Sequence, residues 1–158
     1  MKHIISALVE NQPGVLARVI GLISGRGYNI HSLNVAPTQD PTTSRMTMVV
    51  PGDDRVLEQV TKQLNKLVDV IKVIDLTSEK FLDRELALIK AQFTNKTRST
   101  VMEIAALFNA KIVGVEAKSL TIQMVGASED VDALLELLRP IGVQDVCRTG
   151  VVAVGKAE

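Results

Sequence analysis

The sequence contains few aromatic residues and a single cysteine. It contains no tryptophan, one tyrosine, three phenylalanines and one cysteine among 158 residues. The single cysteine, Cys147, excludes an internal disulfide framework and is typical of a reducing compartment. An aromatic content of 3% is too low for a surface on which nucleic-acid bases stack. Any core must therefore be built from aliphatic residues and methionine.

Net charge is also absent. Eighteen Lys and Arg residues balance 18 Asp and Glu residues, and neither half of the chain has a basic cluster. This pattern argues against nucleic acid or an anionic membrane as the main partner. No apolar run has the length of a membrane span, and Glu10 interrupts the N-terminal apolar stretch too early for a signal peptide. We expect a soluble, cytoplasmic protein that binds neither nucleic acid nor membrane.

The residues needed for catalysis are sparse. His3 and His31 have no metal-ligand spacing, and His31 is better explained as an interface residue. Cys147 lies in a strand-like segment and is expected to be a buried, inert thiol. Neither a nucleophile elbow nor a phosphate-binding loop occurs, and Asp53-Asp54 fits helix capping better than acid–base work. We expect no catalytic residue, no metal and no cofactor, which favours a binding protein over an enzyme.

The first half of the chain alternates strand and helix patterns. Runs rich in β-branched residues predict strands, and apolar residues at helical spacing predict helices after Gly14 and after Asp53-Asp54. The expected order is strand 3–9, helix from 15, strand 30–36, strand 44–50, helix from 54 and strand 68–76.

The second half repeats this order. Ser128 is expected to cap its second helix, with Glu129 and Asp130 in the first turn. The expected order is strand 85–92, helix 99–108, hairpin 111–125, helix from 128 and strand 143–154. The fold class is therefore α+β, with two ferredoxin-like βαββαβ domains at 1–78 and 79–158.

The start of the first predicted helix is a candidate binding site. The first turn of a helix has backbone N–H groups without intrahelical partners and a partial positive charge. Gly14 leaves these groups uncovered, so a carboxylate could bind to the amides of residues 14–16. Asn11 and Asn29 are expected to lie near this helix start, where they would bind an ammonium group or further carboxylate oxygens. Pro-Gly and Asn are also common turn residues, which is the simpler explanation of the same pattern.

The corresponding loop of the second half, residues 93–98, is longer and basic, so we expect only the first domain to keep this site. The segment Tyr28–Gln39 carries no charged residue, although it would form an edge strand. Exposed edges are usually protected by charge, so this edge is expected to pair with a second copy of the chain. Coverage by the second half of the same chain is the alternative.

The segment NQPGVLARVIGLISGRGYNIHSLNVAPT resembles the first ACT domain of the regulatory (small) subunits of acetohydroxyacid synthase, also called acetolactate synthase. The segments SRMTMVV and Arg84–Lys90 extend this resemblance over essentially the whole chain. The resemblance implies a non-catalytic subunit that activates a thiamine-diphosphate-dependent catalytic subunit. It also implies feedback inhibition by L-valine in branched-chain amino-acid biosynthesis, and a homodimer formed through the ACT domain.

The family's effector site is formed by the helix-start loop and the start of the second strand, at the interface of the ACT dimer. In this sequence the resemblance assigns effector binding to these residues: Asn11, Gly14, Val15, Leu16, Asn29, Ile30 and Ala36. Thiamine diphosphate would bind to the catalytic subunit only. Two alternatives stay open: an ACT-type sensor of a different amino acid that serves another enzyme, and an assembly scaffold without a ligand.

Overall fold

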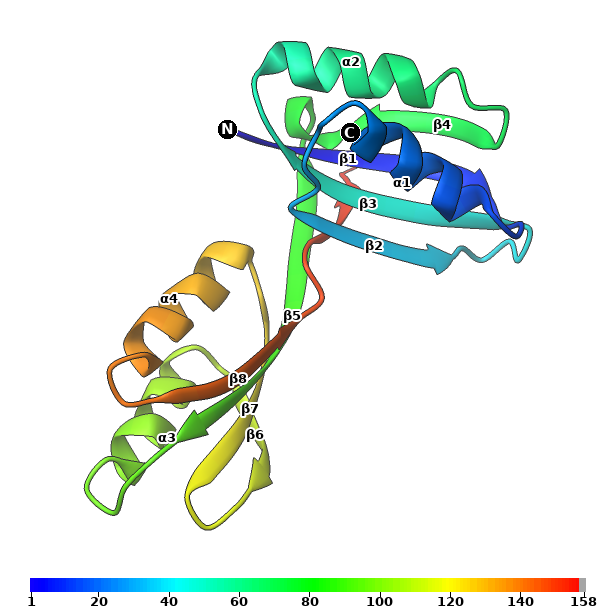
Figure 1. Ribbon diagram of the computed structural model, residues 1–158. Helices are drawn as coiled ribbons and strands as arrows, with labels where there is room; N and C mark the ends of the chain where they lie inside the picture. The colour runs from blue at the N-terminus through cyan, green and yellow to red at the C-terminus, as the bar shows by residue number, and fades with distance from the viewer. Residues whose placement is uncertain (157–158) are drawn as a thin grey trace. The chain divides into compact units, whose positions relative to one another are not determined.

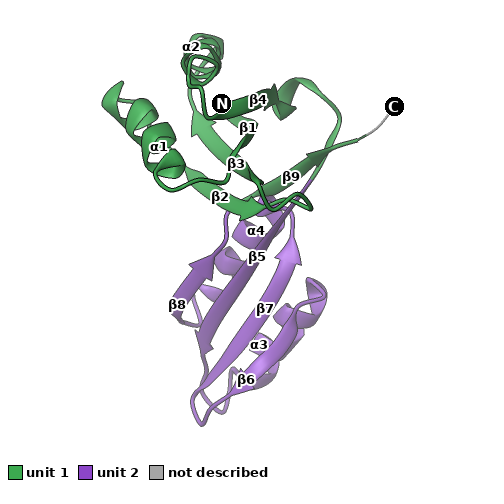
Figure 2. Ribbon diagram, turned by 90° about the vertical axis from the view of Figure 1, so that its right-hand side faces the viewer, with its two compact units in different colours: residues 1–82, 151–158 green, residues 83–150 purple. Residues whose placement is uncertain are grey.

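The computed structural model describes residues 1–156. They form two compact units (Figure 2). The first unit contains residues 1–82 and the C-terminal segment that begins at Val151, and the second contains residues 83–150.

The first unit has the predicted βαββαβ order. Its elements are β1 (Lys2–Glu10), α1 (Val15–Gly25), β2 (Ser32–Pro37), β3 (Thr43–Pro51), α2 (Asp54–Leu64), β4 (Val70–Asp75) and a 3-10 turn at Leu76–Ser78. The strands form an antiparallel sheet in the order β2-β3-β1-β4, which places β2 at an edge as predicted.

The second unit repeats this topology. Its elements are β5 (Phe81–Gln92), α3 (Arg98–Leu107), β6 (Lys111–Val115), β7 (Ser119–Gly126), α4 (Ser128–Leu138) and β8 (Val143–Arg148). The order β6-β7-β5-β8 corresponds strand by strand to that of the first sheet. The prediction of two ferredoxin-like domains is therefore confirmed.

Both helices of the first unit pack on one face of its sheet (Figure 1). Alternate residues of β1 and β3 point toward them, because successive side chains of a strand point to opposite faces. The resulting core is fully aliphatic apart from methionine: Ile5, Ala7, Val9, Val15, Val19, Ile23, Met46, Met48, Val50, Val60 and Leu64.

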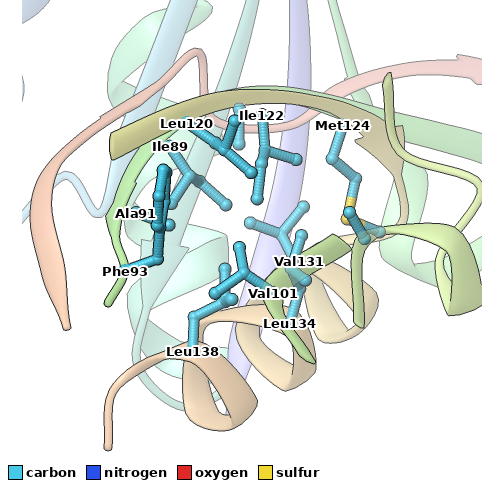
Figure 3. Close-up of a cluster of buried hydrophobic side chains, with 12 residues drawn as sticks. Ile89, Ala91, Phe93, Val101, Leu120, Ile122, Met124, Val131, Leu134 and Leu138 are labelled. Carbon is cyan, nitrogen blue, oxygen red and sulfur yellow. The ribbon is translucent and has the colours of Figure 1, made fainter. Parts of the chain in front are cut away.

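The second unit has a core of the same kind, in which strand residues face α3 and α4 (Figure 3). Ile89, Leu120 and Ile122 on the sheet oppose Val101 on α3 and Leu134 on α4. Its buried aromatic residue is Phe93, at the end of β5.

The C-terminal segment departs from the predicted domain limits. A strand was expected from 143 to 154 within the second domain. Instead β8 ends at Arg148, Gly150 has a φ of 75°, and a separate strand, β9 (Val152–Gly155), pairs with β5. Val151 and Ala153 then pack with Val49 and Leu76 against the helix-free face of the first sheet.

Ser128 also differs from its predicted role. Ala127, not Ser128, is the N-cap of α4, and among residues 1–156 no side chain forms a capping hydrogen bond to this helix. The hydroxyl of Ser128 instead donates to the carboxylate of Glu85 on β5 (2.7 Å). Asp53 behaves as expected, since its carboxylate accepts from the amides of Arg55 and Val56 at the start of α2.

Candidate effector site

The start of α1 has the open geometry that its sequence predicts. Gly14 is the N-cap residue, with a φ of 85° and ψ of −10°, a left-handed conformation that favours glycine. Its carbonyl accepts the first helical hydrogen bond, from the amide of Arg18 (3.0 Å). Within the described chain no side chain caps this helix, and its first turn carries no acidic residue.

The donors at this helix start differ slightly from those expected. The amide of Val15 already donates to the carbonyl of Gln12, although the bond is long (3.3 Å). The amides of Leu16 and Ala17 belong to the first turn, where helix geometry provides no acceptor. The candidate donors are therefore the amides of Gly14 and Leu16, as predicted, together with that of Ala17, whereas the Val15 amide is already used.

A small hollow of about 60 Å³ lies beside this turn, where β1 and β2 end. Both apolar and polar residues line it, as follows: Val9, Glu10, Asn11, Gln12, Val15, Leu16, Val35, Ser44 and Met46. The mixed lining could contact both the apolar side chain and the polar ends of a small amphiphilic ligand, although the hollow is smaller than typical ligand pockets of about 300–1,000 Å³.

Asn11 is held in place at the rim of the hollow. Its backbone amide donates to Thr42 O (2.8 Å), and its side-chain Nδ2 donates to Pro41 O (2.9 Å). These bonds use the backbone N–H and one of the two side-chain N–H donors of Asn11 within its own unit. They leave its side-chain oxygen Oδ1 as an acceptor, which is the group that a ligand ammonium requires.

Asn29 and Ile30 do not lie at this helix start in the same chain. β1 and β2 are both antiparallel to β3, so they are parallel to each other, and Val9 and Pro37 both pair with Ser44. Asn11 therefore lies beyond the end of β2, whereas Asn29 precedes its beginning. The length of β2 alone separates them by about 17 Å, at roughly 3.3 Å per residue. The expectation that one chain brings the two amides together is wrong.

The structure also separates Ala36 from the hollow. Ala36 pairs with Arg45, and its side chain lies on the face of the sheet that the helices do not cover. Its neighbour Val35 pairs with Met46 and lines the hollow. Sequence reasoning missed Val35, although the alternation of β2 side chains offers the signal: Leu33, two residues earlier, packs into the helix-side core.

The outer edge of β2 is open. Its inner edge pairs with β3, and no other strand within residues 1–156 pairs with it. One hydrogen bond joins β2 to the segment that follows the second unit, since Asn34 Nδ2 donates to Val151 O (3.0 Å). As far as Lys156, no strand of the second half pairs with this edge.

The equivalent helix start of the second unit is built differently. Its loop is closed by its own side chains, because Thr97 Oγ1 accepts from the amide of Thr94 (2.8 Å). The guanidinium of Arg98 lies 5.6 Å from the centre of the Phe93 ring. No residue of this loop, 93–98, is a left-handed glycine like Gly14 of the first unit.

Other candidate chemistry is limited in residues 1–156. They contain no group of three or more His, Cys, Asp and Glu side chains that could hold a metal ion. Cys147 is exposed, which contradicts the expected buried thiol: β8 is an edge strand, and Cys147 pairs with Leu88 on the uncovered face of the sheet. No helix in this part of the chain is long and apolar enough to cross a membrane.

Comparison with known families covers both units. Residues 5–72 match the ACT domain of the kind found in small subunits of acetohydroxyacid synthase. Residues 84–157 match the model described as the small subunit of acetolactate synthase.

Individual relatives match over nearly the full chain. A probable acetolactate synthase small subunit from Methanothermobacter thermautotrophicus is 48% identical, covering 98% of this chain and 92% of the relative. The acetolactate synthase small subunit from Haemophilus influenzae is 43% identical, covering 100% and 98%. The crystal structure of the small subunit from Thermotoga maritima superposes with a TM-score of 0.90 at 37% identity, covering 100% of this chain and 99% of that one. With its ACT unit followed by the matching C-terminal unit, the chain belongs to the family of acetolactate synthase small subunits.

Proposed function

We propose that this chain is the regulatory subunit of an acetolactate synthase, which activates a thiamine-diphosphate-dependent catalytic subunit and makes it sensitive to L-valine. Membership of the small-subunit family supports the association with a catalytic subunit. The observation that carries the ligand proposal is the small hollow beside the uncapped start of α1.

The polar groups of this site match the ends of a free amino acid. The ligand carboxylate would bind the amides of Leu16 and Ala17, where the helix dipole adds about 0.3–2 kcal/mol. Its ammonium group would bind Oδ1 of Asn11. The isopropyl group would enter the hollow, and burial at about 0.8 kcal/mol per methylene would favour valine over alanine by about 1–2 kcal/mol.

The open edge of β2 supports a homodimer. Thr38 N–H donates inward to Thr43 O (3.0 Å), so the alternation of an antiparallel strand directs the N–H and C=O groups of Leu33 and Val35 outward. The backbone of Pro37 also faces outward, so its missing N–H does not remove a hydrogen bond between β2 and β3. A second β2, antiparallel to the first, would extend the sheet across a two-fold axis.

Such a dimer would bring Asn29 of one copy close to Asn11 of the other copy. In an antiparallel pair, the start of one strand lies beside the end of the other. Asn29 and Ile30 of one copy would therefore approach the helix start and Asn11 of the other copy. Each of two effector sites would then use residues from both chains. A ligand bound there can inhibit only if it binds the inhibited assembly more tightly than the active one.

Calorimetric titration of the purified full chain with L-valine tests the ligand, with D-valine and L-serine as controls. We expect saturable, stereospecific heat. Acetolactate synthase activity of the catalytic subunit, measured with and without this chain and L-valine, tests activation and inhibition. Preferred binding of another amino acid would favour a different ACT-type sensor, and no binding with or without the catalytic subunit would leave the scaffold hypothesis.

Mixed dimers test the shared site. A dimer of one Gly14→Asp chain and one Asn29→Ala chain keeps one intact site if the two residues come from different chains. It keeps none if both come from the same chain. We expect co-expressed mixed dimers, isolated with two affinity tags, to bind about one valine per dimer, and both homodimeric variants to bind valine much more weakly. Mixed dimers without a tight site would contradict the shared arrangement.

A further inference from the structure

The apolar lining of the hollow has a buried part and a more exposed part. Val9, Val15 and Met46 are the buried residues, and each is at most 2% exposed because it also belongs to the core of the unit. Leu16 and Val35 are 44% and 39% exposed. Leu16 and Val35 are therefore the apolar lining residues that a ligand from solvent can reach directly.

These two exposed residues differ in stiffness. Val35 is β-branched, which restricts its χ1 angle, and it lies on a strand whose register is fixed by six consecutive pairs with β3. Met46, directly opposite Val35 in that register, is unbranched and adapts its shape to what it contacts. Leu16 has a second flexible side-chain torsion beyond χ1. Val35 is therefore the conformationally restricted residue of this apolar lining that can be substituted without disturbing the core of the unit.

We infer that Val35 sets the size of the aliphatic side chain that the hollow accepts. The ligand class is an α-amino acid with a short branched aliphatic side chain, since about 60 Å³ has room for a few heavy atoms. This inference rests on the proposed effector function and adds a specificity-determining residue to it. The neighbouring Ala36 lies on the opposite face of the sheet, so the same strand supplies a matched control.

Substitutions of Val35 in the full chain test the inference through a ratio of affinities. Val35→Ala enlarges the hollow, and we expect it to shift the ratio of the valine and leucine dissociation constants about tenfold toward leucine. Val35→Leu fills the hollow, and we expect it to weaken valine binding about tenfold while L-2-aminobutyrate, one methyl group smaller, is affected less. Val35→Thr keeps the shape, so valine and leucine should keep the ratio of the parent. Ala36→Ser should also keep that ratio.

The measurement is calorimetry with each amino acid, alone and with the catalytic subunit present, on variants whose thermal unfolding confirms a folded chain. Val35→Ile, the mildest enlargement, replaces Val35→Leu if that variant does not fold. If Val35→Ala and Val35→Leu both keep the parent's ratios of dissociation constants, Val35 does not set the size of the ligand side chain. The proposed regulation by valine would not be affected by this result. Failure of the parent chain to bind any amino acid would overturn the proposed effector function, and the inference with it.

Discussion

Arg148 on β8 binds both carboxylate oxygens of Glu85 on β5, through Nε to Oε1 and through Nη2 to Oε2 (3.0 Å). Glu85 is only 2% exposed, and the same guanidinium also donates to Asp132 on α4 (2.7 Å). Ser128 donates a further hydrogen bond to Glu85. One arginine thus connects two strands and a helix of the second unit.

Removing Arg148 should destabilise the second unit. Arg148→Met leaves the buried Glu85 carboxylate without its cation, and loss of one partner of a buried pair costs about 3–5 kcal/mol. Because the Arg148 side chain is one-third exposed, we expect the lower end of this range. Chemical denaturation measures the change. The control is Arg139→Met, which breaks the exposed pair with Glu136 and should change stability by about 0.5 kcal/mol or less.

The same pair predicts how stability depends on pH. Hydrogen bonds from Arg148 lower the pKa of Glu85 below its ordinary value of 4.5, although burial opposes this shift. A lowered folded-state pKa stabilises the fold fully above the unfolded-state value and loses this effect as the pH falls through the folded-state value. Melting temperatures of the parent and of Glu85→Gln should therefore differ most above about pH 5, and the difference should shrink steadily as the pH falls below the ordinary value of 4.5. A difference that stays constant over this range would exclude ionised Glu85 as its cause.

Gly14→Asp should abolish the response to L-valine. It places a carboxylate where the ligand carboxylate would bind, and two such charges about 4 Å apart repel by up to about 4 kcal/mol at an effective dielectric constant of 20. Gly14→Asn is the matched control, because asparagine has a similar shape, carries no charge and also tolerates left-handed backbone. Each new Cβ would lie 2.9 Å from Nη1 of Arg18, a flexible side chain that can move.

We expect valine inhibition to be lost in Gly14→Asp, to be retained in part in Gly14→Asn, and activation of the catalytic subunit to survive in both. Calorimetry and the reconstituted synthase assay measure these effects. Equal loss in the two variants would attribute it to the added side chain and not to its charge.

A charge on the edge of β2 should separate the proposed dimer. Ala36 is exposed near the end of this strand, and lysine on an edge strand disfavours pairing with another edge. We expect Ala36→Lys to shift the chain from dimer to monomer in size-exclusion chromatography with light scattering. Val115→Lys places the same charge on β6, the edge of the second sheet, and should leave the mass unchanged. Unchanged dimers in Ala36→Lys would place the interface elsewhere.

Local patterns in the sequence predict most of the elements and their order. Aliphatic residues at helical spacing after Gly14 form α1, and β-branched runs form β1 and β3. These predictions succeed because spacing decides which face of a single element is apolar, and that face decides how the element packs. Repetition of the pattern likewise identifies two units of one topology. The left-handed conformation of Gly14 at the helix start can also be predicted from the sequence, because glycine adopts positive φ values without steric cost.

Strand register and the pairing of distant segments could not be predicted from local sequence patterns and are seen only in the tertiary structure. The parallel relationship of β1 and β2, through their common partner β3, separates Asn11 from Asn29. Packing of Val151 and Ala153 with Val49 and Leu76 brings the C-terminal segment into the first unit. The Glu85 carboxylate accepts a hydrogen bond from Ser128, which does not cap α4. Each of these outcomes depends on groups far apart in the sequence, whose local propensities are satisfied equally well in other arrangements. Residue types and their spacing are therefore enough to predict the elements and the glycine at the start of α1. Only the register of β2 on β3 shows that Val35, and not Ala36, lines the hollow beside this helix start.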